Sequence, residues 1–409
     1  MAATARRILL ADVVRFGNGK SIKPGGEGCY PVYGSNGIIG GCDEFRYENG
    51  VIIGRVGAYC GSVAYCPEKF WASDNTLVAF PASDEFDTKF LFYLLTDAKL
   101  SRYAGGAAQP LVTQTVLKQV EVNVPPLPVQ RRIAGILSAY DDLIENSQRR
   151  IRILETMARA LYREWFVHFR FPRRRAEARV KADGHQNVKL VPSPLGPIPQ
   201  GWEVTTLGAQ LAALESGKRP KGGIRDVEDG VPSIGAENIN GIGRHDFAGE
   251  KFIPRKFFQK MRKGVVRDGD VAIYKDGAYI GKSSYFRDGF PHSECCVNEH
   301  VFLLRANGVR LKQNALYLWL QEPDTVHAIR ATNANAAQPG INQQSVGGLE
   351  LVVPDEKTAA HFDRLVEPLL AEVINLAKRI QNLRRTRDLL LPKIIEGWHC
   401  DPETLEGTN

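Results

Sequence analysis

An internal duplication constrains this chain more than any other feature of its sequence. The matched segments, first copy and then second, are Gly57–Gly61 and Gly277–Gly281 with an offset of 220, Asn75 and Asn298 with an offset of 223, and Ala107–Pro110 and Ala336–Pro339 with an offset of 229. Because the offset grows along the chain, we expect insertions in loops of the second copy. Any fold proposed for the chain must contain two related halves.

A long helical pattern follows each copy, with apolar or small residues recurring in steps of four and three. This spacing is the heptad seam of helices that pack on one another. The second seam is in register with the first at an offset of 229, and only Arg387 in it is charged. Pro368 lies inside the second pattern and is expected to bend or break the helix. The residues predicted to pack are Ile133, Leu137, Ile144, Ile151, Leu154, Leu161, Val366, Leu369, Val373, Leu376, Ile380, Leu383 and Leu390.

The order globule, helix, globule, helix predicts a closed arrangement. A helix over Val129–His168 has 40 residues and would span roughly 60 Å. If the second helix packs on the first, it returns antiparallel, and the chain closes on itself with pseudo-twofold symmetry. The alternative is a pair of ordinary amphipathic helices, each packed on its own globule. The predicted boundaries are a first globular domain at 1–125, a helical region at 126–168, a basic and proline-rich linker at 169–201, a second globular domain at 202–353, a helical region at 354–397 and a tail at 398–409.

Both globular halves carry short β-rich runs, glycine-rich turns and helical stretches near 88–102 and 311–329. This texture predicts α+β domains with mostly antiparallel sheets. Each half has a glycine-bounded turn after a strand, with a cation two residues before it: Arg55 in the first half and Lys275 in the second. Such a loop can bring a cation and backbone amides to a phosphate, or Arg55 to a guanine edge. An ordinary glycine-rich turn with a surface cation remains the alternative.

Several functional classes find no support in the sequence. The run Gly277–Ser283 has three residues between its glycines where a P-loop needs four. The catalytic motifs of zinc proteases, serine hydrolases and kinases do not occur, so we predict no catalytic residue and no metal site. The seven cysteines form no C-x-x-C pair, which favours reduced thiols in a cytoplasmic protein. The net charge of +7 permits a polyanionic partner without demanding one. No apolar run is long enough to cross a membrane, and the N-terminus lacks a signal-peptide core.

The segments that flank the globules resemble the specificity subunit of type I restriction-modification systems. Pro125–Ile133 resembles the start of the family's first conserved helical region, and Leu154–Phe166 resembles its end. Pro197–Trp202 resembles the start of the second recognition domain, and Leu383–Gly397 resembles the family's C-terminal ending. Together the similarity covers residues 8–397. The second copy departs from the pattern, because Pro354-Asp355-Glu356-Lys357 replaces the Pro-Val-Gln of the first.

This resemblance implies a DNA-binding protein without catalytic activity of its own. Each globule would be a target-recognition domain that reads one half of a bipartite double-stranded DNA target. The helices would set the spacing and dock two modification (methyltransferase) subunits, and a restriction (motor-nuclease) subunit would join the complex. No cofactor is expected in this chain; S-adenosylmethionine, ATP and Mg²⁺ are expected in the partners. The candidate DNA-contacting residues are Lys20, Asn36, Arg55, Tyr59, Gln109, Lys218, Arg219, Lys221, Lys275, Tyr279 and Gln338.

Two other functions are compatible with parts of the sequence. A coiled-coil interaction scaffold without sequence-specific DNA readout would explain the seams equally well, but Arg55 and Lys275 would then be incidental. A stand-alone nuclease or NTPase has only the imperfect P-loop at Gly277 in its favour. Reversing the charge of both cations, or assaying the purified chain for ATP hydrolysis, separates these alternatives.

Overall fold

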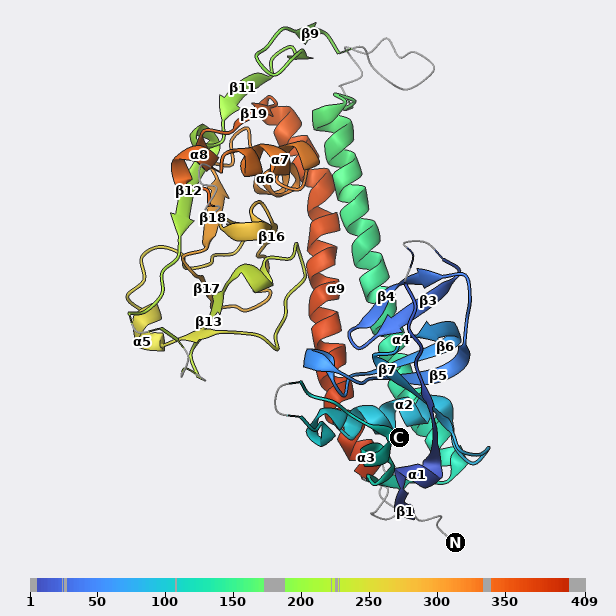
Figure 1. The fold of residues 1–409 in the computed structure, drawn as a ribbon. Helices are drawn as coiled ribbons and strands as arrows, with labels where there is room; N and C mark the ends of the chain where they lie inside the picture. The colour runs from blue at the N-terminus through green and yellow to red at the C-terminus, as the bar shows by residue number, and fades with distance from the viewer. Residues whose placement is uncertain are drawn as a thin grey trace, which may run out of the picture. The chain divides into compact units, whose positions relative to one another are not determined.

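The computed structural model describes residues 6–23, 25, 28–106, 109–172, 188–221, 223–224, 227, 229–333 and 340–396 (Figure 1). The chain divides into two compact units. The first combines residues 1–144 with 382–409, and the second comprises residues 145–381. Both long helices, α4 (Leu127–Tyr162) and α9 (Glu356–Glu396), contribute residues to each unit.

The first unit is built on a six-stranded sheet in the order β2-β7-β5-β6-β3-β4. Helix α2 buries Phe90, Leu91 and Leu94 in the same core cluster as Val51 and Leu77 of the sheet. A buried helix face on one side of a sheet is the α+β layering that the sequence predicts. The elements are β1 (Arg6–Leu9), α1 (Leu10–Val13), β2 (Val14–Asn18), β3 (Tyr30–Gly34), β4 (Gly37–Cys42), β5 (Tyr47–Gly54), η1 (Gly57–Tyr59), β6 (Val63–Ala72), β7 (Thr76–Pro81), α2 (Thr88–Asp97), η2 (Leu100–Tyr103), α3 (Gln114–Lys118) and β8 (Glu121–Val124).

The second unit contains a four-stranded sheet in the order β12-β18-β15-β16 and a three-stranded sheet in the order β14-β13-β17. Helix α6 packs against the larger sheet, where Asn314 accepts a hydrogen bond from the Tyr285 hydroxyl at 2.9 Å. The elements are a π-helical turn (Arg163–Val167), β9 (Leu190–Val191), β10 (Ile198–Pro199), β11 (Glu203–Thr206), η5 (Gly208–Gln210), β12 (Leu211–Ser216), β13 (Val231–Ile234), η6 (Ala236–Asn238), β14 (Phe252–Ile253), α5 (Arg255–Phe258), β15 (Val271–Tyr274), η7 (Gly277–Tyr279), β16 (Ser283–Tyr285), β17 (Cys296–Val297), β18 (Val301–Ala306), α6 (Gln313–Trp319), α7 (Pro323–Ala331), α8 (Gln343–Gly347) and β19 (Glu350–Val353).

The two copies share one topology. The antiparallel run β2-β7-β5-β6 of the first corresponds to β12-β18-β15-β16 of the second. Strand β3 pairs parallel with the end of β6, and β13 pairs parallel with β17. Each copy also has an antiparallel pair between its first and last strands, β1 with β8 and β11 with β19. The duplicated α+β organisation and the mostly antiparallel sheets predicted from the sequence are confirmed.

One detail of the predicted alignment is wrong. The backbone N–H of Arg55 donates to Asn75 O at 2.9 Å, and that of Lys275 donates to His300 O at 3.0 Å. His300 therefore occupies the position of Asn75, two residues beyond the Asn298 that the sequence suggested. The turn itself has the same length in both copies, since Thr76 N donates to Ser73 O and Val301 N donates to Asn298 O, so the extra residues of the second copy lie before β17.

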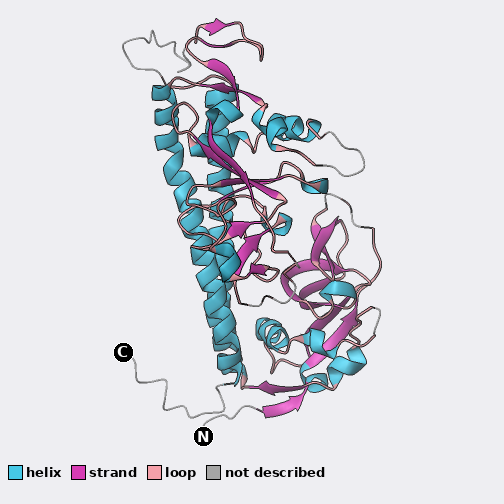
Figure 2. Cartoon of the chain, turned by 90° about the vertical axis from the view of Figure 1, so that its left-hand side faces the viewer, coloured by secondary structure: helices cyan, strands magenta, loops and turns pink. Residues whose placement is uncertain are grey.

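In the second unit, the α4 and α9 segments pack antiparallel, side by side in both views (Figures 1 and 2). Phe362 near the start of α9 packs against Tyr162 at the end of α4, with ring centroids 6.0 Å apart. Further along, Arg150 donates to Glu372 at 2.8 Å. The seam positions of this unit are buried or half-buried: Ile151, Leu154, Leu161, Val366, Leu369, Val373, Leu376 and Ile380.

In the first unit, the opposite ends of the same helices meet. Ile133 and Leu137 of α4 share a core cluster with Leu391 and Ile395 of α9. Arg387, the charged member of the seam, donates to Asp141 of α4 at 2.5 Å. The remaining seam residues of this unit are buried or half-buried: Ile144, Leu383 and Leu390. Helix α9 continues through Pro368, so the break predicted there is absent from the described helix.

A search of the described residues finds no helix that is both long and apolar enough to span a bilayer.

Candidate nucleic-acid interface

Arg55 lies at the end of strand β5, where the chain turns away from the sheet. Its backbone N–H donates to Asn75 O at 2.9 Å, and its carbonyl accepts from Val112 N at 3.0 Å. The side chain is half-buried, and among the described residues its Nε finds no hydrogen-bond partner. A guanidinium N–H in this state gains more from an anionic acceptor than one already paired within the protein.

The turn after Arg55 needs glycine at both ends. Gly57 has φ +77° and Gly61 has φ +84°, a region that residues with a Cβ rarely adopt. A Cβ on Gly61 would also lie 2.2 Å from Ser101 N. Between the glycines, η1 leaves Tyr59 59% exposed. The turn therefore holds an aromatic side chain in solvent four residues after the cation.

Asn36 and Gln109 belong to segments that hydrogen-bond to this loop. Ser35, next to Asn36 in the turn between β3 and β4, accepts at its carbonyl from the Ser62 hydroxyl at 2.6 Å. Pro110, next to Gln109, accepts from Gly57 N at 3.1 Å. Both predicted residues are exposed. The structure thus brings four candidates of the first copy, Asn36, Arg55, Tyr59 and Gln109, to one edge of the sheet.

Lys20 lies at the same edge of the sheet, next to a point where two backbone segments cross closely. Its N–H donates to Ala72 O at 2.9 Å, and a Cβ on the preceding Gly19 would lie only 1.7 Å from Ser73 O. In the second copy, a Cβ on Gly217 would lie 1.6 Å from Val297 O. Only glycine fits at either crossing. Lys20 follows Gly19 and Lys218 follows Gly217, so the two lysines are structurally equivalent. Both lysines are exposed.

The second copy reproduces the loop around Lys275. The Lys275 carbonyl accepts from Ile341 N at 2.9 Å, as Arg55 accepts from Val112. Gly277 and Gly281 have φ +65° and +86°, and η7 leaves Tyr279 53% exposed. Two cations contact aromatic rings here: Lys275 Nζ lies 5.1 Å from the Phe302 ring, and Lys282 Nζ lies 4.2 Å from that of Tyr279. The predicted Gln338 lies outside the described residues.

The charge at this edge is mixed in the second copy. Arg219 pairs with Glu299 at 3.1 Å, whereas Lys221 is exposed in the following turn. Glu237 lies just after β13, near the position that Asn36 holds after β3, and it accepts from Lys251 at 2.7 Å. Burial tends to raise the pKa of Glu237, but the hydrogen bond and charge of Lys251 outweigh it and hold that pKa below its ordinary value. An ionised carboxylate can accept from the amino group of cytosine, so the two copies present different chemistry.

Sequence reasoning missed a basic hollow beside Lys218. A pocket of about 390 Å³ is lined by Lys218, Lys260, Arg262 and Lys263 together with Phe257 and Met261. The segment 255–263 holds five cations in nine residues, a density that itself signals a polyanion partner. The folded chain adds what the sequence hides, namely that this run lies beside the lysine of the glycine crossing.

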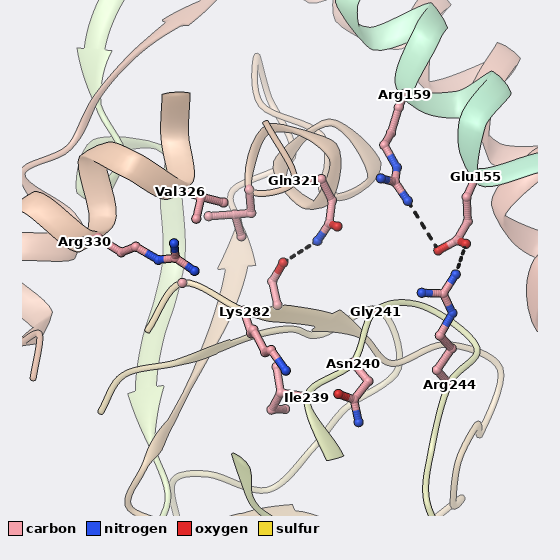
Figure 3. A pocket seen from close by; sticks show the side chains of 13 residues that line it. Glu155, Arg159, Ile239, Asn240, Gly241, Arg244, Lys282, Gln321, Val326 and Arg330 are labelled. Atoms are coloured by element: carbon pink, nitrogen blue, oxygen red, sulfur yellow. Dashed lines mark hydrogen bonds and ion pairs between the residues drawn. The ribbon is translucent and has the colours of Figure 1, made fainter. Parts of the chain in front are cut away.

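A second pocket of the same unit is lined in part by the 239–244 loop and by α4 (Figure 3). Glu155, whose side chain is 5% exposed, pairs with Arg244 from the loop and with Arg159, at 3.8 Å, from its own helix. Burial raises the pKa of Glu155, and the two guanidinium groups oppose that shift. A buried carboxylate shared by two cations fixes the loop on the helix, and we assign this pocket a structural role.

Comparisons with known proteins match part of this chain to a family. Residues 8–156 match the family described as type I restriction modification DNA specificity domain. The type I restriction enzyme MjaIX specificity subunit of Methanocaldococcus jannaschii is 25% identical over 363 residues, which are 87% of this chain and 79% of the relative. The MjaVIII specificity subunit of the same organism is also 25% identical, over 57% of this chain and 51% of the relative.

The fold has a counterpart among solved structures. The crystal structure of a type I restriction-modification system S subunit from M. genitalium superposes with a TM-score of 0.58 at 17% sequence identity, over 96% of each chain. Residues 8–156 belong to the family of type I restriction modification DNA specificity domains, and over most of its length the chain resembles the specificity subunits of type I restriction enzymes.

Proposed function

We propose that this chain is the DNA-reading subunit of a type I restriction-modification complex, with each of its two domains reading one half of a bipartite target. The observation that carries the proposal is the duplicated loop. In each copy a half-buried cation, Arg55 or Lys275, leads into a glycine-bounded turn that exposes a tyrosine, Tyr59 or Tyr279. Backbone contacts to phosphate fix the register of a protein on a duplex, and side chains at base edges supply specificity.

Two short half-sites read together discriminate better than either one alone. Linking two binding modules turns the second contact into an intramolecular event, so their affinities reinforce each other when the spacing is right. The paired segments of α4 and α9 are the candidates for setting that spacing. Within each unit their seam residues are buried or half-buried, which is the packing expected of a stiff pair of helices.

The outer faces of the same helices suit a protein partner. Large apolar side chains are exposed on them, although such residues are normally buried in packed helices: Ile136, Leu143, Ile153, Met157, Leu365 and Leu389. Contiguous exposed apolar surface is typical of interfaces, and these residues occur on the helix segments of both units. We assign this surface to two methyltransferase subunits, with a restriction subunit joining the complex. S-adenosylmethionine, ATP and Mg²⁺ would act in those partners, in the cytoplasm, while this chain remains non-catalytic.

The decisive test is charge reversal of the duplicated cation. The full chain, with its modification partner, is titrated with its cognate duplex and with a scrambled duplex, and the salt dependence of each affinity is measured. We expect Arg55→Glu and Lys275→Glu each to weaken cognate binding by about 10- to 100-fold, since one good base or phosphate contact is worth about 1–3 kcal/mol. The cognate target itself is found by mapping methylated adenines in the host genome.

Matched control variants distinguish a specific role of Arg55 and Lys275 from a general effect of positive surface charge on DNA binding. Arg15 is an exposed cation near the opposite end of β2 from Lys20, and Lys357 is an exposed cation at the start of α9. Arg15→Glu and Lys357→Glu should leave the preference for cognate DNA unchanged. If Arg55→Glu and Lys275→Glu behave like these controls, the chain is an interaction scaffold and the proposal is wrong.

A further inference from the structure

Three side chains of the second unit converge on one point, although one of them, His292, lies 42 residues beyond Glu250 in the sequence. The Nε2 atom of His245 lies 2.5 Å from Oε1 of Glu250, and the Nε2 atom of His292 contacts the same oxygen. One ligand atom from each residue lies within 4.8 Å of both others. The His245 side chain is 1% exposed, that of Glu250 10%, and that of His292 24%.

The surroundings of the three groups are mainly aromatic. The Phe247 ring stands edge-on to that of His245 at 4.6 Å between centroids and to that of His292 at 5.7 Å. Phe290 continues this wall at 6.3 Å from Phe247. An apolar shell of this kind keeps imidazole rings in place and strengthens electrostatic interactions within the site. The partial exposure of His292 leaves one side open to water.

Both segments that carry the triad are additions to the common frame of the two copies. His245 and Glu250 lie between η6 and β14, where the first copy passes from β3 to β4 through a short turn. His292 lies between β16 and β17, which correspond to the two ends of the continuous strand β6. Two separate insertions thus meet at one cluster of potential ligands.

We propose that His245, Glu250 and His292 form a binding site for a zinc-type divalent cation. Two imidazoles and one carboxylate are a set that binds zinc through three protein ligands, with water in the fourth position. Imidazole nitrogen also favours first-row transition metals over Mg²⁺ or Ca²⁺. The present contacts are those of hydrogen-bonded groups, and small side-chain movements would open the space that a cation with bonds of about 2.0–2.2 Å needs.

The cation would join two loops that are each already docked on the long helices of this unit. Next to His245, Arg244 pairs with Glu155 of α4. A few residues before His292, Arg287 pairs with Glu367 of α9. Each loop is thus tied to one helix at its base and to the other loop at the triad. A bound cation would make this connection continuous and stabilise the second unit, and no such group of ligands occurs among the described residues of the first.

Metal binding to the purified full chain tests the proposal directly. After chelator treatment, Co²⁺ and Zn²⁺ are titrated in separate experiments. We expect one tightly bound equivalent, a visible d–d absorption with Co²⁺ that Zn²⁺ displaces, and a rise of several degrees in the unfolding temperature of the second unit. Glu250→Gln retains a polar group of the same size but removes a ligand. It should weaken metal binding by at least about 100-fold, which is more than the loss of an outer-shell partner of a ligand causes.

His292→Gln provides a second ligand variant, in case Glu250→Gln disturbs the fold. Circular dichroism establishes that each variant is folded. The control is His300→Asn, because His300 contacts Asp276 at 2.6 Å and Glu299 at 3.2 Å but lies outside the triad. This variant should bind Co²⁺ like the unchanged chain. The proposal is overturned if the unchanged chain binds no equivalent of either metal, or if folded Glu250→Gln and His292→Gln bind as tightly as the control.

Discussion

The two copies show how one frame can be kept while its edges diverge. The first copy joins β3 to β4 through a short turn and runs β6 unbroken from Val63 to Ala72. The second copy opens both places, and the insertions bring together His245, Glu250 and His292. In contrast, the glycine-bounded turns η1 and η7 have the same conformation in both. Backbone geometry that admits only glycine was retained, whereas loops without that constraint changed length.

The long helices also begin differently in the two copies. At the start of α4, the buried side chain of Gln130 accepts from Asp87 N at 2.9 Å and donates to Pro125 O at 2.8 Å and Glu85 O at 3.0 Å. At the start of α9, Asp355 accepts from Thr358 N at 3.0 Å instead. The first helix is fixed to its domain by a buried amide, and the second is capped locally by a carboxylate near solvent.

The largest expected effect is a loss of folding stability. It tests whether the two ends of the seam belong to two different cores. Phe362, fully buried, packs against Tyr162, Trp165 and Phe166. Phe362→Ala should cost about 3–5 kcal/mol in the second unit, by lost burial and the cavity that remains. Its counterpart in the first unit is Ile133, whose truncation to Ala removes fewer atoms and should cost about 2–4 kcal/mol. Urea unfolding, followed by a spectroscopic probe in each unit, measures both losses of stability. If one substitution destabilised the two units equally, the assignment of each residue to its own core would be contradicted.

The next largest effect concerns the buried Gln130 side chain at the start of α4 and its contribution to stability. Gln130→Ala leaves the Asp87 N–H and two carbonyls without their partner and should cost about 1–3 kcal/mol, the desolvation penalty of buried polar groups. The exposed Gln119 provides the control, since Gln119→Ala should change stability by no more than about 0.5 kcal/mol. Chemical denaturation of both variants decides whether the buried amide matters as the geometry indicates.

The duplicated loops differ in the kind of cation they present. Arginine binds a guanine edge or a phosphate with two parallel N–H bonds, which lysine cannot do. Arg55→Lys should therefore weaken cognate binding by about 1–2 kcal/mol and relax base preference in the half-site that the first copy reads. Lys275→Arg keeps the positive charge near phosphate and should leave the salt dependence of binding unchanged. A relaxed preference in both half-sites after Arg55→Lys would mean that the copies do not read separately.

The smallest effect concerns the cap of α9 and its response to pH. Burial tends to raise the pKa of Asp355, but hydrogen bonds from Thr358 and from the backbone of Lys357 outweigh it, so the pKa lies below its ordinary value. The stabilisation is fully present above the unfolded-state pKa of about 3.9 and is lost as pH falls through the lower folded-state value. Asp355→Ala should cost about 1 kcal/mol at neutral pH and flatten the acid dependence of stability. Asp355→Asn keeps the cap and should lose only the pH dependence.

Much of this fold could be predicted because its signals are local or periodic. The seam from Ile133 onward follows from a repeat of 3.5 residues, and the second seam follows by a constant offset. The turns at Gly57 and Gly277 follow from glycine spacing after a strand. Of the bend or break predicted at Pro368, the break is absent, since α9 continues through it. The match of Asn75 with Asn298 was also wrong, since residue identity is a poor guide where extra residues precede the matched turn.

The sequence alone determined that the chain is duplicated, that its two helices share one heptad register, and that each copy carries a cation before a glycine-bounded turn. These features depend on residues close together in the chain or on strict periodicity. Only the tertiary structure decided that Lys218 lies beside Lys260 and Lys263, and that His245, Glu250 and His292 meet. Such neighbours come from different loops, and loop paths depend on how the whole domain packs. Composition and spacing do not encode that packing in any short stretch.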